Sequence, residues 1–189
     1  MTNDEIIQYL KKHLSHARFT HTLGTWRTAQ AIAAGYKVSK EKVDIAALLH
    51  DAGKGLTKHG LINYIKKTKT AVPYLQDIIK YNPWVLHGFA SASIAQDKFG
   101  IRDKDILNAI KEHTTAGPGM SVLAKIIYLA DITAPDRRFA GVNKIRWQAK
   151  RDLNKAMQTA LFYKTYHVLA NKKWLHPAAI EAWNSLIKI

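Results

Sequence analysis

The chain of 189 residues contains no cysteine. This absence excludes disulfide bonds, thiolate metal sites and a cysteine nucleophile, and it is typical of proteins from a reducing compartment. Long apolar runs are absent too, because the longest candidate, residues 126–130, stops at Asp131, far short of the ~20 residues that cross a bilayer. The N-terminal residues 1–13 lack the apolar stretch of a signal peptide. We therefore expect a soluble cytoplasmic protein that has no membrane partner.

Acidic residues are scarce. The sequence has 14 Asp and Glu against 29 Lys and Arg, which gives a formal net charge of +15. Such an excess favours anionic partners, including nucleotides, nucleic acids and acidic surfaces. A generally cationic surface that keeps the protein soluble explains the excess equally well. The net charge therefore does not choose a function by itself.

Strand patterns are also missing, since no alternation of apolar and polar residues is flanked by hairpin turns. Apolar residues spaced by three and four positions instead predict helices along the whole chain, with Ser39, Asp103 and Ser121 as N-caps. The fold class is therefore all-α. We predict helices over residues 3–14, 18–34, 39–49, 58–67, 84–98, 103–113, 121–131, 142–169 and 177–187.

Six histidine and aspartate residues at well-separated positions form a candidate metal site. Imidazole and carboxylate groups contributed by several helices are the donors of a transition-metal site rather than of a magnesium site. Several of the six fall near predicted helix ends, from which side chains can converge on one cavity while the helix bodies build its walls. An adjacent His-Asp pair closes an apolar run, and the full set is His21, His50, Asp51, His87, His113 and Asp131.

The number of donors indicates two metal ions. Asp51 has two carboxylate oxygens and can bridge two ions, whereas the neutral imidazole of His50 offers one nitrogen and is a terminal ligand. Four of the six residues suffice for one ion, and the surplus imidazoles of His87 and His113 supply a second ion with Asp51 shared. Two ions ~3.5–4 Å apart can clamp a bridging hydroxide and a phosphate oxygen during in-line displacement. Dinuclear phosphate hydrolysis is therefore the chemistry that these residues support best, provided that they converge.

The segments around these residues resemble the HD-domain phosphohydrolase superfamily and, more narrowly, its YqeK family. The resemblance runs through nearly the whole chain, including residues 176–186. The two-letter HD motif is weakly specific alone, but the ordered set is strong. Its members are HTLG at 21–24, LLHDAGK at 48–54, LHG at 86–88, AIKEHTT at 109–115, MSVLAKIIYLAD at 120–131 and PDR at 135–137.

That family is similar to symmetrical bis(5′-nucleosyl)-tetraphosphatases, bacterial cytoplasmic enzymes that cleave diadenosine tetraphosphate into two ADP. The resemblance implies an HD-domain helical bundle with two metal ions, often iron, although manganese, cobalt, nickel or zinc suits the same donors. We expect one such domain over residues 1–189, with a core over about residues 16–135 and C-terminal helices over about residues 142–189 packed on it. The expected reaction is attack of a metal-bridging hydroxide on a central phosphate. The resemblance assigns His21, His50, Asp51 and Asp131 to one ion and Asp51, His87 and His113 to the other.

Cationic and hydroxyl side chains must bind the charge of a tetraphosphate that the metal ions leave unneutralised. The ammonium three residues after the shared aspartate is the first candidate, and with that aspartate we expect it to act in catalysis by stabilising developing charge. An arginine fork suits bidentate phosphate contact, and threonine hydroxyls can donate hydrogen bonds. The candidate substrate-binding residues are Lys54, Thr114, Thr115, Arg137 and Arg27.

The sequence departs from the family pattern at two positions, neither of which is a proposed ligand. Ala134 stands where an acidic residue is common, which removes a negative charge near the site, and Ala116 is inserted before Gly117. The charge lost at Ala134 bears on substrate preference and turnover more than on metal binding.

Two other functions stay open at this point. Another HD-type phosphohydrolase would act on nucleoside 5′-phosphates, deoxynucleoside triphosphates or guanosine polyphosphates. A nucleic-acid-binding helical module would use a basic stripe on the helix predicted over 142–169, but no groove-reading motif supports it. The favoured partner is a dinucleoside polyphosphate, and the oligomeric state, a homodimer included, is not determined. The basic stripe would comprise Arg146, Lys150, Arg151 and Lys155.

Overall fold

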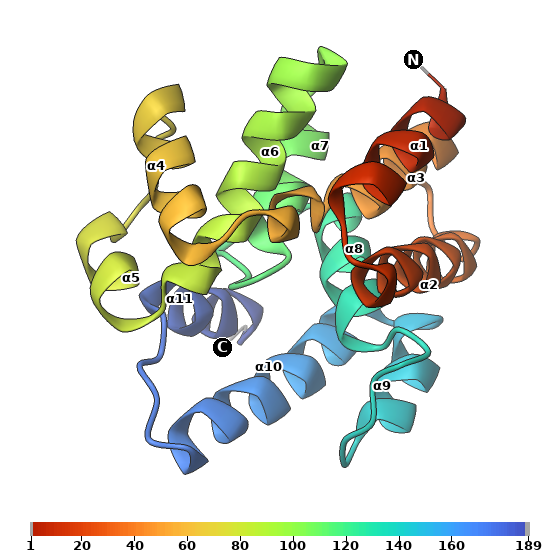
Figure 1. Cartoon of the computed structure of the whole chain (residues 1–189). Coiled ribbons are helices and arrows are strands. Elements are labelled where there is room, and N and C mark those ends of the chain that lie inside the picture. The colour runs from red at the N-terminus through yellow and green to blue at the C-terminus, as the bar shows by residue number, and fades with distance from the viewer. Residues whose placement is uncertain (1, 188–189) are drawn as a thin grey trace.

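The structure is a computed structural model that describes residues 2–187, and this part of the chain is helical with no strand (Figure 1). The all-α prediction is therefore confirmed. The elements are α1 (Asn3–His13), α2 (His16–Ala33), α3 (Lys40–Leu49), the 3-10 helix η1 (Ala52–Gly55), α4 (Lys58–Thr68), α5 (Leu75–Tyr81), the 3-10 helix η2 (Pro83–Val85), α6 (Leu86–Phe99), α7 (Lys104–Glu112), α8 (Val122–Ile132), α9 (Val142–Ala149), α10 (Leu153–Ala170) and α11 (Pro177–Leu186).

Capping side chains fix where three central helices begin. The side chains of Ser39, Asp103 and Ser121 accept hydrogen bonds from backbone N–H groups in the first turns of α3, α7 and α8, as predicted. Each such cap stabilises the fold by about 1 kcal/mol. Gly100 ends α6 with a φ of 67°, in the left-handed region that a residue with a Cβ adopts at a cost. These local signals set the start points of the helices that lead to the site.

The single helix predicted over residues 142–169 is wrong, because the chain divides it into α9 and α10. The backbone N–H groups of Arg151 and Asp152 both donate to the carbonyl of Gln148. The Asp152 side chain then accepts a hydrogen bond from the N–H of Lys155 and starts α10 as its N-cap. An aspartate that competes for backbone donors therefore interrupts a segment whose apolar spacing is continuous.

The basic stripe that we expected on one helix over residues 142–169 does not form, so this prediction is wrong as well. Arg146 lies on α9, whereas Lys155 lies on α10. The Arg146 guanidinium donates hydrogen bonds to the carbonyls of Thr133, Ala134 and Arg137. Its charge therefore stabilises the loop that follows α8.

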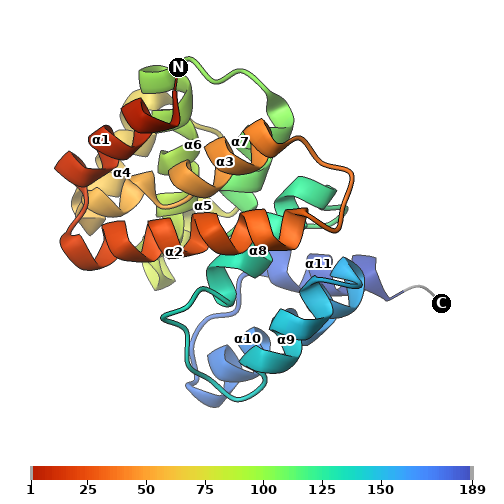
Figure 2. The ribbon, with the colours of Figure 1, turned by 90° about the vertical axis from the view of Figure 1, so that its right-hand side faces the viewer.

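Helix α8 forms the centre of the molecule. It packs against α2, α3, α7 and α10, and Figure 2 shows α9, α10 and α11 together on one side of it. Residues 126–130 of α8 are all buried, as expected for a helix that is apolar on every face. A smaller apolar cluster, which includes Leu61, Ile78 and Phe89, joins α4, α5 and α6. Among residues 2–187 no helix is both long and apolar enough to cross a membrane.

Candidate metal centre

The six predicted metal ligands converge on one site from five helical segments. One comes from α2, two follow directly on α3, one lies in the first turn of α6, one follows α7 and one lies in the last turn of α8. Five of the six are buried, and the sixth side chain, at the end of α8, is 17% exposed. In this order they are His21, the pair His50 and Asp51, His87, His113 and Asp131.

Asp51 lies at the middle of the cluster. Its Oδ1 is 3.1 Å from Nε2 of His87 and 3.4 Å from Nε2 of His113, and its Oδ2 is 3.9 Å from Nε2 of His50. The carboxylate therefore presents one oxygen to each side of the cluster. Possible ligand atoms of Asp51, His50 and His21 all lie within 4.8 Å of one another, and so do those of Asp51, His87 and His113. Asp51 is common to the two groups, as its two oxygens led us to expect.

Three of the imidazoles are held by the helix ends that carry them. The Nδ1 atoms of His50, His87 and His113 each lie within hydrogen-bond distance of a backbone carbonyl three residues earlier. Because a carbonyl can only accept, each Nδ1 carries the proton, and each neutral ring turns the lone pair of Nε2 toward the cluster. The C-terminal ends of helices have carbonyls without intrahelical partners, which explains the acceptors of His50 and His113, whereas His87 in the first turn of α6 uses a carbonyl of η2.

The resulting donor set fits a metal ion. The Nε2 atoms of His87 and His113 are 3.0 Å apart, and two lone pairs at this distance repel unless a cation or a proton lies between them. Nε2 of His50 is buried and has no hydrogen-bond partner among the described residues. Buried polar atoms are rarely left without a partner. Lone pairs and carboxylate oxygens that converge in this way are the donors of a divalent metal site.

For four of the six residues the pKa shifts favour the protonation state that metal binding needs, whereas the pKa of His21 is raised, because its contacts with Asp131 and Asp136 outweigh the lowering effect of burial. Burial lowers the pKa of His50 to about 4 and also lowers the pKa of His87. Burial alone would raise the pKa of Asp51, but the surrounding imidazoles hold it well below its usual range. The pKa of Asp131 is also depressed: burial raises it, and the hydrogen bond to His21 with nearby positive charge outweighs that effect. Neutral imidazoles and ionised carboxylates bind cations without first losing protons.

Asp136 holds His21 in place. Both of its carboxylate oxygens are 3.0 Å from Nδ1 of His21, while Nε2 of that ring is 3.0 Å from Oδ1 of Asp131. A carboxylate on the far nitrogen of a ligating histidine fixes its tautomer and orientation. Asp136 lies two residues after Ala134, so a carboxylate still contacts the site although the commonly acidic position is alanine.

A close approach of two backbones brings the His-Asp pair next to α6. A Cβ atom on Gly53 would lie 2.7 Å from the carbonyl of His87, so no larger residue fits without a shift. The N–H of Gly53 also donates to the Ser91 hydroxyl, at 2.8 Å. The glycine two residues after Asp51 is therefore needed for Asp51 and His87 to meet.

Several of the predicted substrate-binding residues lie at this cluster. Lys54 is half-buried, and burial lowers its pKa. Nη2 of Arg137 is 2.6 Å from Oδ1 of Asp131, so its fork is engaged with a proposed metal ligand. The Thr114 hydroxyl lies 3.1 Å from Nε2 of His87. These three groups therefore lie beside the cluster.

Two other predicted residues are placed differently. The Thr115 hydroxyl donates to the carbonyl of Ala116, which uses its proton within the turn. Arg27 is exposed on α2 and makes no hydrogen bond or ion pair with any residue that the structure describes. The helical rotation that separates Arg27 from His21 accounts for this position.

Sequence reasoning missed two cations beside the cluster. Nη1 of Arg18 is 3.6 Å from Oδ2 of Asp51, and Nζ of Lys164 donates to the carbonyl of Thr114. Arg18 precedes His21 by three residues on α2, a spacing that places two side chains on one helix face. That spacing could have identified Arg18. Lys164 comes from α10, far along the chain, and no local pattern indicates it.

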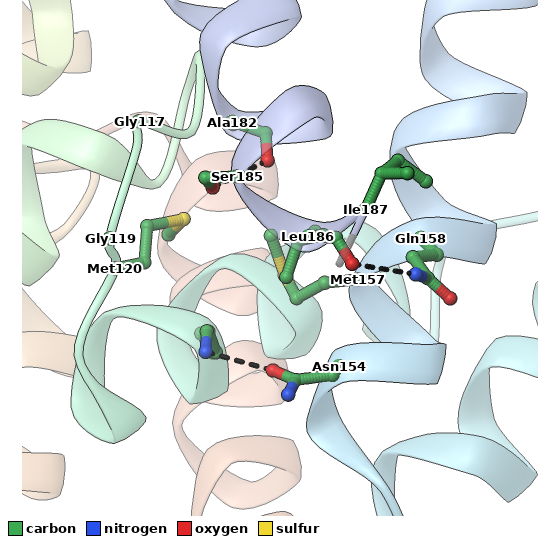
Figure 3. A pocket seen from close by; sticks show the side chains of 11 residues that line it. Gly117, Gly119, Met120, Asn154, Met157, Gln158, Ala182, Ser185, Leu186 and Ile187 are labelled. Atoms are coloured by element: carbon green, nitrogen blue, oxygen red, sulfur yellow. Dashed lines mark hydrogen bonds between the residues drawn. The ribbon is translucent and has the colours of Figure 1, made fainter. Parts of the chain in front are cut away.

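Residues of the C-terminal helices line two of the cavities in the described part of the chain. One of about 640 Å³ adjoins the cluster and is lined in part by His113 and Asp131. Figure 3 shows the other, of about 500 Å³, which is lined by residues of α10 and α11 such as Met157 and Leu186. None of the six cluster residues lines the second cavity. Of these two cavities, the first is the one that reaches the cluster.

Comparison with known proteins identifies the family. The family model of the HD domain matches residues 18–136, which include all six cluster residues. The chain belongs to the HD domain family. As an HD domain it has buried His and Asp groups that fit a divalent metal site.

Relatives of this HD-domain chain match over nearly their full length. It is 36% identical to the symmetrical bis(5′-nucleosyl)-tetraphosphatase of Halalkalibacterium halodurans, over 99% of this chain and 98% of the relative. It is 31% identical to the Bacillus subtilis protein of the same name, with the same coverage. A crystal structure from Clostridium acetobutylicum, described as a "predicted HD superfamily hydrolase involved in NAD metabolism", has a TM-score of 0.92 and 38% identity. It covers 98% of this chain and 97% of its own.

Proposed function

We propose that this protein hydrolyses dinucleoside tetraphosphates symmetrically, converting diadenosine tetraphosphate and water into two molecules of ADP. The observation that carries the proposal is the buried cluster in which Asp51 is common to two groups of ligand atoms. Full-length relatives named symmetrical bis(5′-nucleosyl)-tetraphosphatase support the choice of substrate.

Two metal ions fit the donors better than one. We propose that one ion is held by four residues and the other by three, with Asp51 common to both. Iron is our first choice, and the same nitrogen and oxygen donors also accept manganese, cobalt, nickel or zinc. Bound ions would neutralise phosphate oxygens and make water acidic enough to act as a nucleophile near neutral pH. The proposed ligands are His21, His50, Asp51 and Asp131 for the first ion, and Asp51, His87 and His113 for the second.

The protein's own side chains would position the substrate and stabilise its charge. Water adds to one of the two central phosphorus atoms, the bond from that phosphorus to the oxygen that joins it to the other central phosphorus breaks, and two fully ionised ADP and two protons are released. We assign Lys54 and Arg18 to the phosphate oxygens, where preorganised cations stabilise the charge that develops. Thr114 would donate its hydroxyl proton to a phosphate oxygen. Asp136 acts through His21, which it keeps in one orientation.

The test pairs product identification with metal analysis. Protein purified without oxygen is assayed with diadenosine tetraphosphate and with nucleoside 5′-phosphates, deoxynucleoside triphosphates and guanosine polyphosphates. ADP as the sole nucleotide product of the first substrate supports the proposal. ATP with AMP, or turnover of another class alone, rejects it in favour of a different HD-type phosphohydrolase. Asp51→Ala should abolish turnover while the helical circular dichroism is kept, and full activity in that variant would refute the site.

A further inference from the structure

The cavity of about 640 Å³ beside the cluster extends the site toward the C-terminal helices. Its volume lies within the ~300–1,000 Å³ that is usual for small-molecule sites. His113 and Asp131 line it, and so do Phe139 and Tyr163, whose ring centroids are 6.2 Å apart. The lining therefore combines residues of the cluster with an aromatic pair.

Lys164 supplies a cation to this lining. It is half-buried, its Nζ donates to the carbonyl of Thr114, and the same atom lies 4.9 Å above the ring of Tyr128. No carboxylate forms an ion pair with Lys164 among residues 2–187. An ammonium has three N–H donors, so two are left for a ligand. Burial lowers the pKa of Lys164 to about 8, which leaves most molecules charged at neutral pH.

A second polar group in the same lining lacks a partner. Tyr128 is 1% exposed, and its hydroxyl makes no hydrogen bond with any described residue. A buried donor without a partner is unfavourable, and a bound ligand that accepts its proton removes the penalty. Tyr128 and Lys164 thus each present an unused donor at one cavity.

We propose that this cavity is the subsite for one nucleoside phosphate unit of the substrate, with Lys164 binding a phosphate oxygen and Phe139 and Tyr163 contacting the nucleoside. The assignment rests on the proposed function. All three residues follow residue 136, where the match to the HD domain ends. The HD segment would thus supply the hydrolytic cluster, and the C-terminal helices would supply the preference for a nucleotide.

The experiment measures equilibrium binding of ADP and of inorganic pyrophosphate to metal-loaded protein by calorimetry. We expect Lys164→Met to weaken the binding of ADP and of pyrophosphate by roughly 10-fold or more, which is the effect of losing one charged hydrogen bond. Lys164→Arg keeps the cation and should retain much of the affinity. Phe139→Ala should weaken the binding of ADP and leave the affinity for pyrophosphate unchanged. Lys155→Met is the matched control, because Lys155 lies on the same helix with a side chain that is 72% exposed.

The outcomes separate binding from a purely structural role. Unchanged ADP affinity in Lys164→Met overturns the assignment. Equal losses of ADP and pyrophosphate in Phe139→Ala, or a loss of bound metal in Lys164→Met, would mean that these residues only support the cluster, which also overturns it. If the wild type does not cleave diadenosine tetraphosphate but Lys164→Met, unlike Lys155→Met, loses affinity for ADP and pyrophosphate while it keeps its metal, the proposed reaction fails and the subsite stands. If the wild type cleaves diadenosine tetraphosphate normally and Lys164→Met binds ADP as tightly as the wild type, the subsite is rejected and the proposed reaction stands.

Discussion

Replacing Asp51 with asparagine should abolish binding of both of the metal ions that we propose. Asp51 contributes one oxygen toward His87 and His113 and the other toward His50, so no other side chain belongs to both groups of ligand atoms. Asparagine keeps the shape of the side chain but has one oxygen and no charge. We therefore expect about two ions per chain in the wild type and few or none in the variant.

The expected stability change follows from binding linkage. An ion present at 100 times its dissociation constant stabilises the native state by ~2.7 kcal/mol, so two independent ions stabilise it by about 5 kcal/mol. In a chain of this size each 1 kcal/mol corresponds to ~2–4 °C in Tm, so metal binding should raise the Tm of the wild type by about 10–20 °C. The Tm of Asp51→Asn should hardly change when metal is added. His87→Gln removes a ligand from one group only and should keep roughly half of the shift.

Scanning calorimetry with Mn²⁺ and with excess EDTA, together with elemental analysis of dialysed protein, measures both quantities. Asp77→Asn is a control, because Asp77 is exposed on α5. A wild-type Tm that is the same with metal and with EDTA would show that the cluster does not hold ions. A full shift in Asp51→Asn would show that the ions do not depend on the shared carboxylate.

Three further predictions concern residues outside the ligand set. Asp136→Asn should lower metal affinity or turnover by ~10–100-fold, because the carboxylate that orients His21 is lost, and a metal titration of the variant measures this. Asp44→Asn should cost ~2 kcal/mol in urea unfolding at pH 7, because the buried carboxylate accepts hydrogen bonds from side chains of α2 and α3. Although burial alone would raise it, those hydrogen bonds depress the pKa of Asp44, so the stabilisation is present above the unfolded value of ~3.9 and is lost as the pH falls through the lower folded value. The variant should therefore lose less stability than the wild type on acidification below pH 4, and parallel curves would contradict this reasoning. Asp152→Ala should lower Tm by ~2–4 °C through loss of the α10 cap, and an unchanged Tm would mean that the cap is dispensable.

Local signals predicted most of the fold. The N-caps Ser39, Asp103 and Ser121 start their helices where the sequence indicated, because capping depends on a few neighbouring residues. The break between α9 and α10 was missed, because apolar spacing continues across it and only the competing Asp152 side chain ends the first helix. Helix α5 was missed as well. It has seven residues, and its N-cap residue Tyr74 has a φ of 59° and makes no side-chain cap hydrogen bond, so the usual sequence signal for a helix start is missing.

The site divides in a similar way. Convergence of the ligands could not be derived from their spacing, and it entered through the family resemblance and the count of donors. The cations that reach the cluster from other segments were the hardest to predict. The position of Arg18 could have been predicted from its helical spacing to His21. The position of Lys164 could not, because it depends on how α10 packs beside the turn that contains Thr114. Such long-range contacts leave no periodic trace in the sequence.

The positions of the histidine ligands relative to helix ends can nevertheless be predicted from the sequence. His50 and His113 each follow the last residue of a helix, and His87 is the second residue of α6, just after the 3-10 helix η2. Each has a carbonyl three residues earlier that can accept from Nδ1. That hydrogen bond leaves the Nε2 lone pair facing away from its own helix. A histidine in the middle of a helix lacks this acceptor, because the carbonyl is already used by the helix. Position at a helix end is therefore a physical reason, independent of any motif, for expecting a histidine to bind metal through Nε2. In this helical chain the rule applies to His50 and His113 at predicted helix ends, but also to His13 at the end of α1, whose Nδ1 lies 2.8 Å from the carbonyl of Tyr9, so helix-end position selects the ligands only together with the motif.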